Sequence, residues 1–279
     1  MAEPGLVISH LFDRPGPRLR RLANEAPVWS LRNSREPAWL AGREHRRSFH
    51  WGLGPVLADF KSEFIRQGLD RFLAERRVEN FSFDLGPAAR RHLSILPLST
   101  PLGPSAIRRL TESALNLIRR HYSGPLAAEN YNFYSTGLYR HITEPGFIRD
   151  YLAEFDLGLV LDLAHGAVTA HNTERTPENY FADLPLERVS EIHVSRPWLP
   201  PSSTLPAADA HQAPAEREWG WLKGLINCGR LPGGVAVFVE YYGDLGKLIK
   251  AQSYLNGLLP EGNRPIRPQP GYCPAGQLY

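Results

Sequence analysis

The stretch Leu157-Gly-Leu-Val-Leu-Asp-Leu-Ala-His165 decides the fold, because it joins a short apolar strand to polar side chains at its end. A continuous aliphatic run of this length is typical of a strand that is covered on both faces in a parallel sheet. Thr176-Pro177 then has the pattern of a helix start, with threonine as the N-cap. A second strand is predicted at Val189–Ser195. This order of strand, helix and strand predicts a parallel sheet with helical crossovers.

The same alternation extends over most of the chain. The predicted strands are Gly5–Ser9, Pro27–Leu31, Arg46–Trp51, Val78–Phe83, Leu126–Asn130, Gly158–Leu163, Val189–Ser195 and Val235–Tyr241. Apolar spacings of three and four predict one buried helix face over residues 56–73 and others over 107–118 and 245–258. Thr143, before Glu144-Pro145, has the pattern of a further N-cap.

Eight strand–helix units close a (β/α)8 TIM barrel, so the predicted fold class is α/β with a single domain. We expect this barrel to span residues 1–259. Residues 260–279 are rich in proline and lack apolar periodicity, and are predicted as a C-terminal tail.

Composition excludes several classes of protein. Hydrophobic residues make up 42% of the chain and charged residues 22%, which is ordinary globular usage. A net charge of +3 is not the electrostatic footprint of a nucleic-acid or anionic-membrane partner. There is no signal-peptide pattern in the first ten residues and no run of 18 apolar residues. With only two cysteines, a reducing compartment is favoured, so we expect a cytoplasmic protein.

Imidazole and carboxylate side chains recur where the predicted strands end. In a barrel the carboxyl ends of all strands meet at one rim, where the active sites of this fold lie. Asp209 and His211 follow in a long loop, and their spacing of two places both side chains on one face of an extended backbone. The full set is His50, Asp84, Glu129, Asp162, His165, His193, Asp209, His211 and Glu240.

This set predicts a metal centre. Carboxylates inside apolar runs are costly to bury unless they are paired or bound to metal. One ion takes about four to six ligands, so nine groups indicate two or three ions that share bridging carboxylates. Nitrogen and oxygen ligands without thiolate favour iron, manganese or zinc. Taken singly, each histidine could instead be a satisfied surface or core residue. We interpret five histidines as ordinary residues: His10, His45, His92, His121 and His141.

Several motifs follow one another at intervals that match a known family. They are His50-Trp51-Gly52, Leu96-Pro97-Leu98, Ala128-Glu129-Asn130, Thr143-Glu144-Pro145-Gly146-Phe147, Leu161-Asp162, Ala170-His171-Asn172, Leu184–His193, Asp209-Ala210-His211 and Val239-Glu240. From about residue 50 to residue 244 the chain resembles the multinuclear non-heme iron-dependent oxidative enzymes. This TIM-barrel family includes the iron enzyme of methanobactin biosynthesis.

The resemblance implies an enzyme with two or three irons that uses dioxygen as cosubstrate. Members remodel residues, often cysteine, of ribosomally made peptides, and many act with a separate protein that recognises the leader of the precursor peptide. The matching positions imply seven iron ligands: His50, Glu129, Asp162, His193, Asp209, His211 and Glu240.

Two positions depart from the family's pattern. The chain has Asp84 where a second histidine is usual, and His165 where an asparagine is usual. Either Asp84 ligates through oxygen and His165 through nitrogen, or the first iron site is weakened or lost. These changes indicate an outlying branch, whose substrate is not inherited from better-known members.

The leading hypothesis is oxidative modification of a ribosomal peptide, at cysteine or a neighbouring residue. In it, Glu129 bridges two metals, with His50 and Asp84 completing one site. Asp162, His193 and Glu240 complete the second, and His165, Asp209 and His211 hold a third. Four side chains just beyond the ligand positions are candidates for the substrate groove, with ordinary loop packing as the alternative: Tyr131, Tyr134, Arg196 and Trp198.

Two other functions stay open at the level of sequence. A divalent-metal TIM-barrel isomerase or an endonuclease IV-like hydrolase would also gather these ligands, although a DNA-acting enzyme would be expected to show a basic stripe. The second possibility is a non-catalytic scaffold that retains a residual metal site, because Asp84 and His165 are altered.

Overall fold

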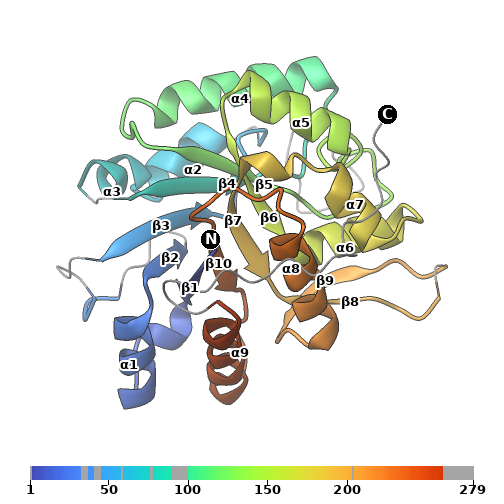
Figure 1. The fold of residues 1–279 in the computed structure, drawn as a ribbon. Helices are drawn as coiled ribbons and strands as arrows, with labels where there is room; N and C mark the ends of the chain where they lie inside the picture. Colours follow the sequence, from blue (N-terminus) through green and yellow to red (C-terminus); the bar gives the residue numbers. More distant parts are fainter. Residues whose placement is uncertain are drawn as a thin grey trace.

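The computed structural model describes residues 2–32, 37–40, 45–57, 59–75, 78–89, 100–202 and 204–259. Among these residues, eight parallel strands close into a barrel in the order β1-β10-β7-β6-β5-β4-β3-β2 (Figure 1). The strands are β1 (Glu3–Ile8), β2 (Val28–Arg32), β3 (Arg46–Trp51), β4 (Asn80–Asp84), β5 (Leu126–Glu129), β6 (Gly158–Asp162), β7 (Val189–Val194) and β10 (Ala236–Val239). The predicted TIM barrel is confirmed, and each predicted strand is found within two residues at either end. The predicted tail, His92 and the Leu96-Pro97-Leu98 motif lie outside the described residues.

Helices surround the barrel (Figure 1). They are α1 (Pro17–Glu25), α2 (Phe60–Arg66), α3 (Leu69–Glu75), α4 (Pro104–Ile118), α5 (Pro145–Glu154), α6 (Leu163–Asn172), α7 (Pro177–Asp183), α8 (Glu216–Asn227) and α9 (Leu245–Leu258). The strands are apolar because the helices cover their outer side: Leu159, Val160 and Leu161 of β6 are fully buried. Within the described segments, no helix combines the length and apolar character that crossing a membrane requires.

Two helix predictions need correction. Residues 56–73 do not form one helix face, because α2 and α3 are separated at Gly68, whose φ of 69° is left-handed. Ile65, an apolar residue within that predicted buried face, is 48% exposed. The N-cap of α5 is Glu144, whose carboxylate accepts from the Phe147 N–H at 2.6 Å, rather than Thr143. The Thr143 hydroxyl donates instead to the Tyr139 carbonyl.

The N-cap predicted for α7 is confirmed. The Thr176 side chain accepts a hydrogen bond from the Asn179 N–H at 3.2 Å, and Pro177 is the first helical residue. This cap fixes where α7 begins after the turn that follows α6.

A two-stranded antiparallel sheet outside the barrel had no counterpart in the sequence prediction. Its strands are β8 (Arg196–Trp198) and β9 (Ala208–Gln212), and they form a hairpin that projects beside α6 (Figure 1). Asn172 of α6 joins the two elements: its Nδ2 donates to the Ala207 carbonyl, and its Oδ1 accepts from the Ala207 N–H at 2.7 Å. The hairpin is thereby held against the helix that carries His165.

We expect Gly166→Ala to lower the free energy of unfolding by about 1–2 kcal/mol. The added Cβ would lie 2.4 Å from Cε1 of the buried Phe181, a clash that calls for the upper part of the overpacking range, about 2–3 kcal/mol, against a helix-propensity gain of about 1 kcal/mol. Urea denaturation measures the change. Gly220→Ala is the matched control, because this glycine also lies inside a helix but has nothing within 4 Å of its Cβ position. Its substitution should leave stability unchanged or raise it.

Candidate metal centre

All nine predicted ligand residues come together at the carboxyl end of the barrel. They fall into three groups, and within each group one ligand atom per residue lies within 4.8 Å of the others. The groups are His50, Asp84 and Glu129; then Glu129, Asp162, His193 and Glu240; then His165, Asp209 and His211. Their membership equals that of the three hypothesised sites. That they bind metal stays a prediction.

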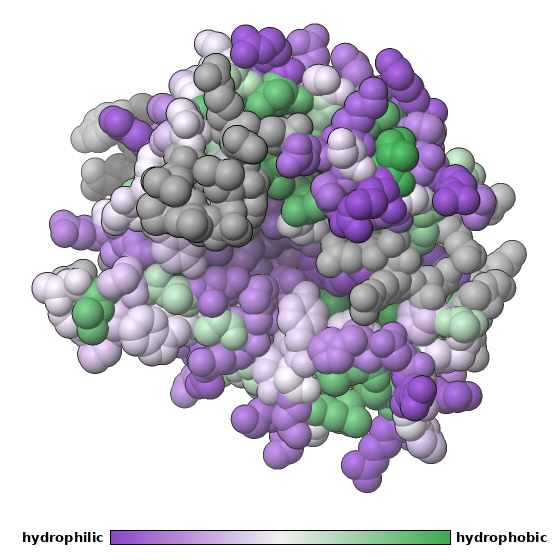
Figure 2. All heavy atoms as spheres, turned by 180° about the vertical axis from the view of Figure 1, so that it is seen from behind, coloured by the Kyte–Doolittle hydropathy of each residue, from purple (hydrophilic) through white to green (hydrophobic). Residues whose placement is uncertain are grey.

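A cavity of about 460 Å³ opens at these residues and is lined by members of all three groups. Figure 2 shows a hollow near the middle of the face that points away from the viewer in Figure 1, and the residues visible in it are mainly hydrophilic. A cavity of this size is in the range of small-molecule sites.

The first group depends on the register of three neighbouring strands. His50 of β3 pairs with Ser82 of β4, and Asp84, two residues further along β4 on the same face, pairs with Glu129 of β5. His50 Nε2 lies 3.1 Å from Asp84 Oδ1 and 3.1 Å from Glu129 Oε2. The other ring nitrogen, Nδ1, is 3.0 Å from the Ser82 hydroxyl. Ser82 therefore holds the imidazole with Nε2 facing the two carboxylates.

The second group lies at the centre of the barrel mouth. His193 Nδ1 is 3.3 Å from Glu129 Oε1 and 3.4 Å from Glu240 Oε2, and Asp162 is paired with His193 in the sheet register. Glu129 therefore has one oxygen beside His50 and the other beside His193. This is the arrangement of a bridging carboxylate.

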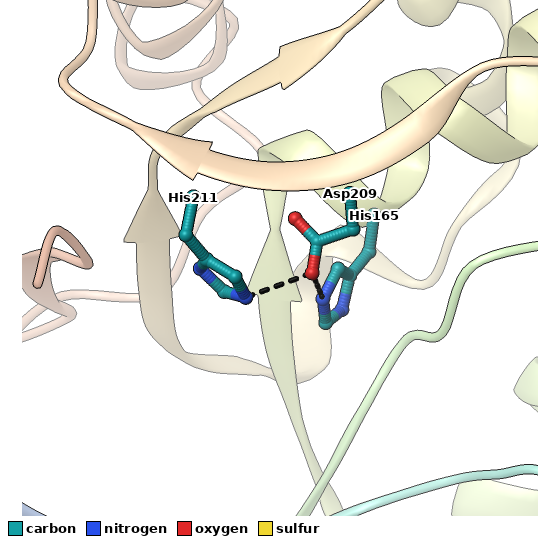
Figure 3. A group of neighbouring side chains, drawn as sticks. All are labelled: His165, Asp209 and His211. Carbon is teal, nitrogen blue, oxygen red and sulfur yellow. Dashed lines mark ion pairs between the residues drawn. The ribbon is translucent and has the colours of Figure 1, made fainter.

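The third group joins the barrel to the β8–β9 hairpin. Figure 3 shows the Asp209 carboxylate between the two imidazoles, with Oδ2 at 2.7 Å from His211 Nε2 and 3.4 Å from His165 Nε2. His165 Nδ1 lies 2.9 Å from the Asn130 carbonyl, which orients the ring. Asp209 and His211 share one face as expected, although His211 has a left-handed φ of 39° rather than an extended one.

Burial and mutual charge dominate the titration of the central group. Glu129, Asp162 and His193 are at most 1% exposed. Burial favours the neutral carboxyl of Glu129, yet His193 and His50 outweigh burial and lower its pKa to about 2. Burial raises the pKa of Asp162 to about 7, and the negative charges of Glu129 and Glu240 add to the rise. Burial opposes the charged form of His193, but Glu129 raises its pKa to about 10.

In the third group too, neighbouring opposite charges shift the pKa values against the effect of burial. Burial opposes the charge on His211, and the Asp209 carboxylate overcomes it and raises the histidine pKa to about 9. The pKa of Asp209 is correspondingly lowered, against burial, by His165 and His211. Buried carboxylates thus hold protons on neighbouring imidazoles, and a bound cation would displace those protons and neutralise the carboxylates in their place.

The residues fit a multinuclear metal site in two respects. Glu129 Oε2, Asp162 Oδ2 and Asp209 Oδ1 are buried and have no hydrogen-bond partner within the described part of the chain. Glu129 Oε2 lies close to His50 but lacks hydrogen-bond geometry. Unpartnered buried carboxylate oxygens are costly unless a cation binds them. The donors are all imidazole nitrogen or carboxylate oxygen, which suits iron, manganese or zinc.

Arg32 and Tyr242 belong to the site, although sequence reasoning did not find them. Arg32 Nη2 lies 3.2 Å from Glu240 Oε1, and the Tyr242 hydroxyl donates a hydrogen bond to the same oxygen. Together they leave Glu240 Oε2 to face His193. Arg32 ends β2, so the rule that strand ends meet at the rim would have identified it. His10, interpreted as ordinary, lines the cavity.

Of the four candidate substrate-binding residues, one lines the cavity and three do not. Tyr131 lines the cavity, and burial, followed by the charge of Asp84, raises the pKa of its hydroxyl. Tyr134, Arg196 and Trp198 are not among the described residues of the cavity lining. The Tyr134 hydroxyl instead accepts from the Asp209 N–H at 3.4 Å, which supports β9. A role of the four in substrate binding stays a prediction.

Comparison with known proteins identifies a family and confirms the resemblance. The family model described as RiPP precursor modification enzyme MbnB/TglH/ChrH matches residues 65–244, more than half of the chain. A UPF0276 protein of Rhizobium meliloti (strain 1021) is 28% identical over 142 residues. That match covers 50% of this chain and 45% of the relative, so the chain spans less than half of the relative's length.

Solved structures with low sequence identity share the fold. Endonuclease IV from Thermus thermophilus superposes with a TM-score of 0.60 at 16% identity, covering 94% of this chain and 99% of that one. The 3-keto-D-glucoside 4-epimerase from E. coli gives a TM-score of 0.58 at 14% identity, with 92% and 99% covered. These likenesses establish the barrel architecture alone.

Proposed function

Because the chain belongs to the RiPP precursor modification enzyme family MbnB/TglH/ChrH, we propose that it is an iron-dependent enzyme that uses dioxygen to oxidise a precursor peptide. The modified position would be a cysteine or a residue next to it. The observation that carries the proposal is the shared carboxylate of Glu129, whose two oxygens face two different ligand groups. Such sharing serves a cluster of ions rather than an isolated ion.

The three groups would hold two or three iron ions. When bound, iron supplies the one-electron and dioxygen chemistry that protein side chains lack. The Tyr242 hydroxyl keeps its proton, because burial and the negative charge of Glu240 raise its pKa well above the usual value. It therefore stays a hydrogen-bond donor that orients Glu240. Arg32 keeps its positive charge, which offsets part of the negative charge of the carboxylates.

The cavity would admit one side chain of the peptide with its neighbouring backbone. A volume of about 460 Å³ takes in a small part of a peptide, so the remainder would lie outside the barrel mouth. A separate protein would recognise the leader of the precursor, as in the family, and the enzyme would act in the cytoplasm. Neither a nucleic acid nor a membrane is part of the proposal, consistent with the net charge of +3.

The proposal is tested with protein prepared without oxygen and loaded with Fe²⁺. We expect two or three irons per chain by metal analysis, and a Mössbauer spectrum of coupled high-spin ions. Oxygen uptake should then require the peptide encoded beside the enzyme, and mass spectrometry should find that peptide changed in mass. A protein that is active with zinc alone and indifferent to oxygen would instead be a metal-dependent isomerase or hydrolase. Biological function that persists without any bound metal would indicate a scaffold.

A further inference from the structure

A polar layer lies beneath the ligand residues inside the barrel. Along a strand, side chains two positions apart share a face, so Glu191 and His193 of β7 both point inward. Ser48 lies two residues before His50 on β3, and Asn80 lies two before Ser82 on β4. TIM-barrel interiors are usually filled by branched aliphatic side chains. A buried glutamate at this depth, 3% exposed, therefore needs a specific explanation.

One oxygen of Glu191 is held by two donors. Ser48 Oγ donates to Oε1, and Asn80 Nδ2 donates to the same atom at 2.6 Å. The other oxygen, Oε2, has no hydrogen-bond partner among the described residues. His193 Nε2 faces it at 3.6 Å. The carboxylate is thus anchored at one end and turned toward the imidazole with the other.

Two of the three other candidate ligand histidines show what this arrangement does. Nδ1 of His50 is hydrogen-bonded to the Ser82 hydroxyl, and Nδ1 of His165 is hydrogen-bonded to the Asn130 carbonyl. Histidines that bind metal usually donate the other ring N–H to such a partner, which sets the tautomer and the ring orientation.

From this geometry we propose that Glu191 is the positioning residue of His193, accepting its Nε2–H and leaving Nδ1 for a metal ion. Arg32 Nη2 also lies 3.5 Å from Nε2, and because a guanidinium only donates, that contact belongs to the other tautomer, with the proton on Nδ1. Once Nδ1 binds a metal ion the proton must lie on Nε2, and Glu191 Oε2 is the acceptor that faces it. Nδ1 is the nitrogen beside Glu129 and Glu240, where the ion would lie. The inference rests on the proposed metal centre.

Glu191→Gln tests the inference with almost no change of shape. Ser48 and Asn80 both donate to Oε1, so the amide oxygen of the glutamine must take that position. The amide nitrogen then faces His193 Nε2 with its protons, and it disfavours the tautomer that leaves Nδ1 free. We expect the Co²⁺ affinity of one site to fall about 10- to 100-fold, the usual effect of losing such a partner. The other sites should keep their affinity.

The measurement is an anaerobic competition titration with Co²⁺ and a chelator, followed by the visible absorption of the bound ion. Glu218→Gln is the matched control, because Glu218 is a fully buried glutamate whose bonds are to the Ala215 N–H and Arg217 on α8. Asn80→Ala is a second test, since it removes one anchor of Glu191. It should weaken the same site by a smaller factor, and it replaces Glu191→Gln if that variant does not fold.

The outcomes distinguish the role of Glu191 from the existence of the metal centre. Wild-type affinity at every site in both Glu191→Gln and Asn80→Ala overturns the role of Glu191 and leaves the metal centre intact. Equal weakening in Glu218→Gln also overturns it, because the effect would then be one of general stability. A wild-type protein that binds no Co²⁺ overturns the proposed centre itself.

Discussion

Replacing Glu129 by glutamine is expected to lower peptide modification more than about a hundredfold. This exceeds the effect of losing a residue that only hydrogen-bonds to a metal ligand, which is about 10- to 100-fold. Glu129 belongs to two of the three ligand groups, so the substitution weakens both together. The glutamine is similar in size, and the site loses a charge that lies beside His50 and His193. Metal analysis of the purified variant should show fewer ions per chain, and mass spectrometry of the peptide should show little product.

Glu187→Gln is the control for this substitution. Its carboxylate is 63% exposed and lies 4.0 Å from Arg230, so it removes the same charge at the surface. It should retain wild-type metal content and activity. Full activity in Glu129→Gln with a full complement of metal would contradict the bridging role.

Removing the metal is expected to lower Tm by about 10 °C. A ligand at a thousand times its Kd stabilises the folded state by about 4 kcal/mol, and each kcal/mol shifts Tm by about 2–4 °C in a domain of this size. The metal-free site also keeps unpartnered oxygens of Glu129, Asp162 and Asp209 away from water. Differential scanning calorimetry of the protein with EDTA and with Fe²⁺ under argon measures the difference.

The Glu129→Gln variant provides the comparison for the calorimetry. Because it should bind fewer ions, its Tm should respond less to added Fe²⁺. An identical Tm for the wild-type protein with and without metal would exclude a resident ion that binds the folded state.

Much of the barrel could be predicted because its signals are local. The strands are short apolar runs that end in polar or charged residues, and this pattern is visible in the sequence without knowledge of the packing. In β7 (Val189–Val194), for example, His193 lies near the end of the strand. Once the parallel barrel is expected, all strand ends meet at one rim. Seven of the nine ligand candidates therefore followed from the fold prediction and from chain position, whereas Asp209 and His211 were found by their spacing in the loop after β7.

The rest depends on contacts between distant segments. The break at Gly68 was missed because apolar spacing continues across it. Arg32 was missed because it lies one residue beyond the predicted strand, and its partner Glu240 is more than 200 residues away. The place of Glu191 beside Ser48 and Asn80 depends on which strands face each other across the barrel interior. No sequence motif reports which strands face each other in this way.

The β8–β9 hairpin divides the centre into two parts with different requirements. Two groups are supplied by barrel strands and the residues at their ends, so barrel closure alone assembles them. The third takes Asp209 and His211 from a segment that the barrel ladder does not include. Its geometry depends on the docking of Ala207 against Asn172. Metal occupancy of the third group would therefore depend on this single tertiary contact, whereas the other two groups stay assembled without it.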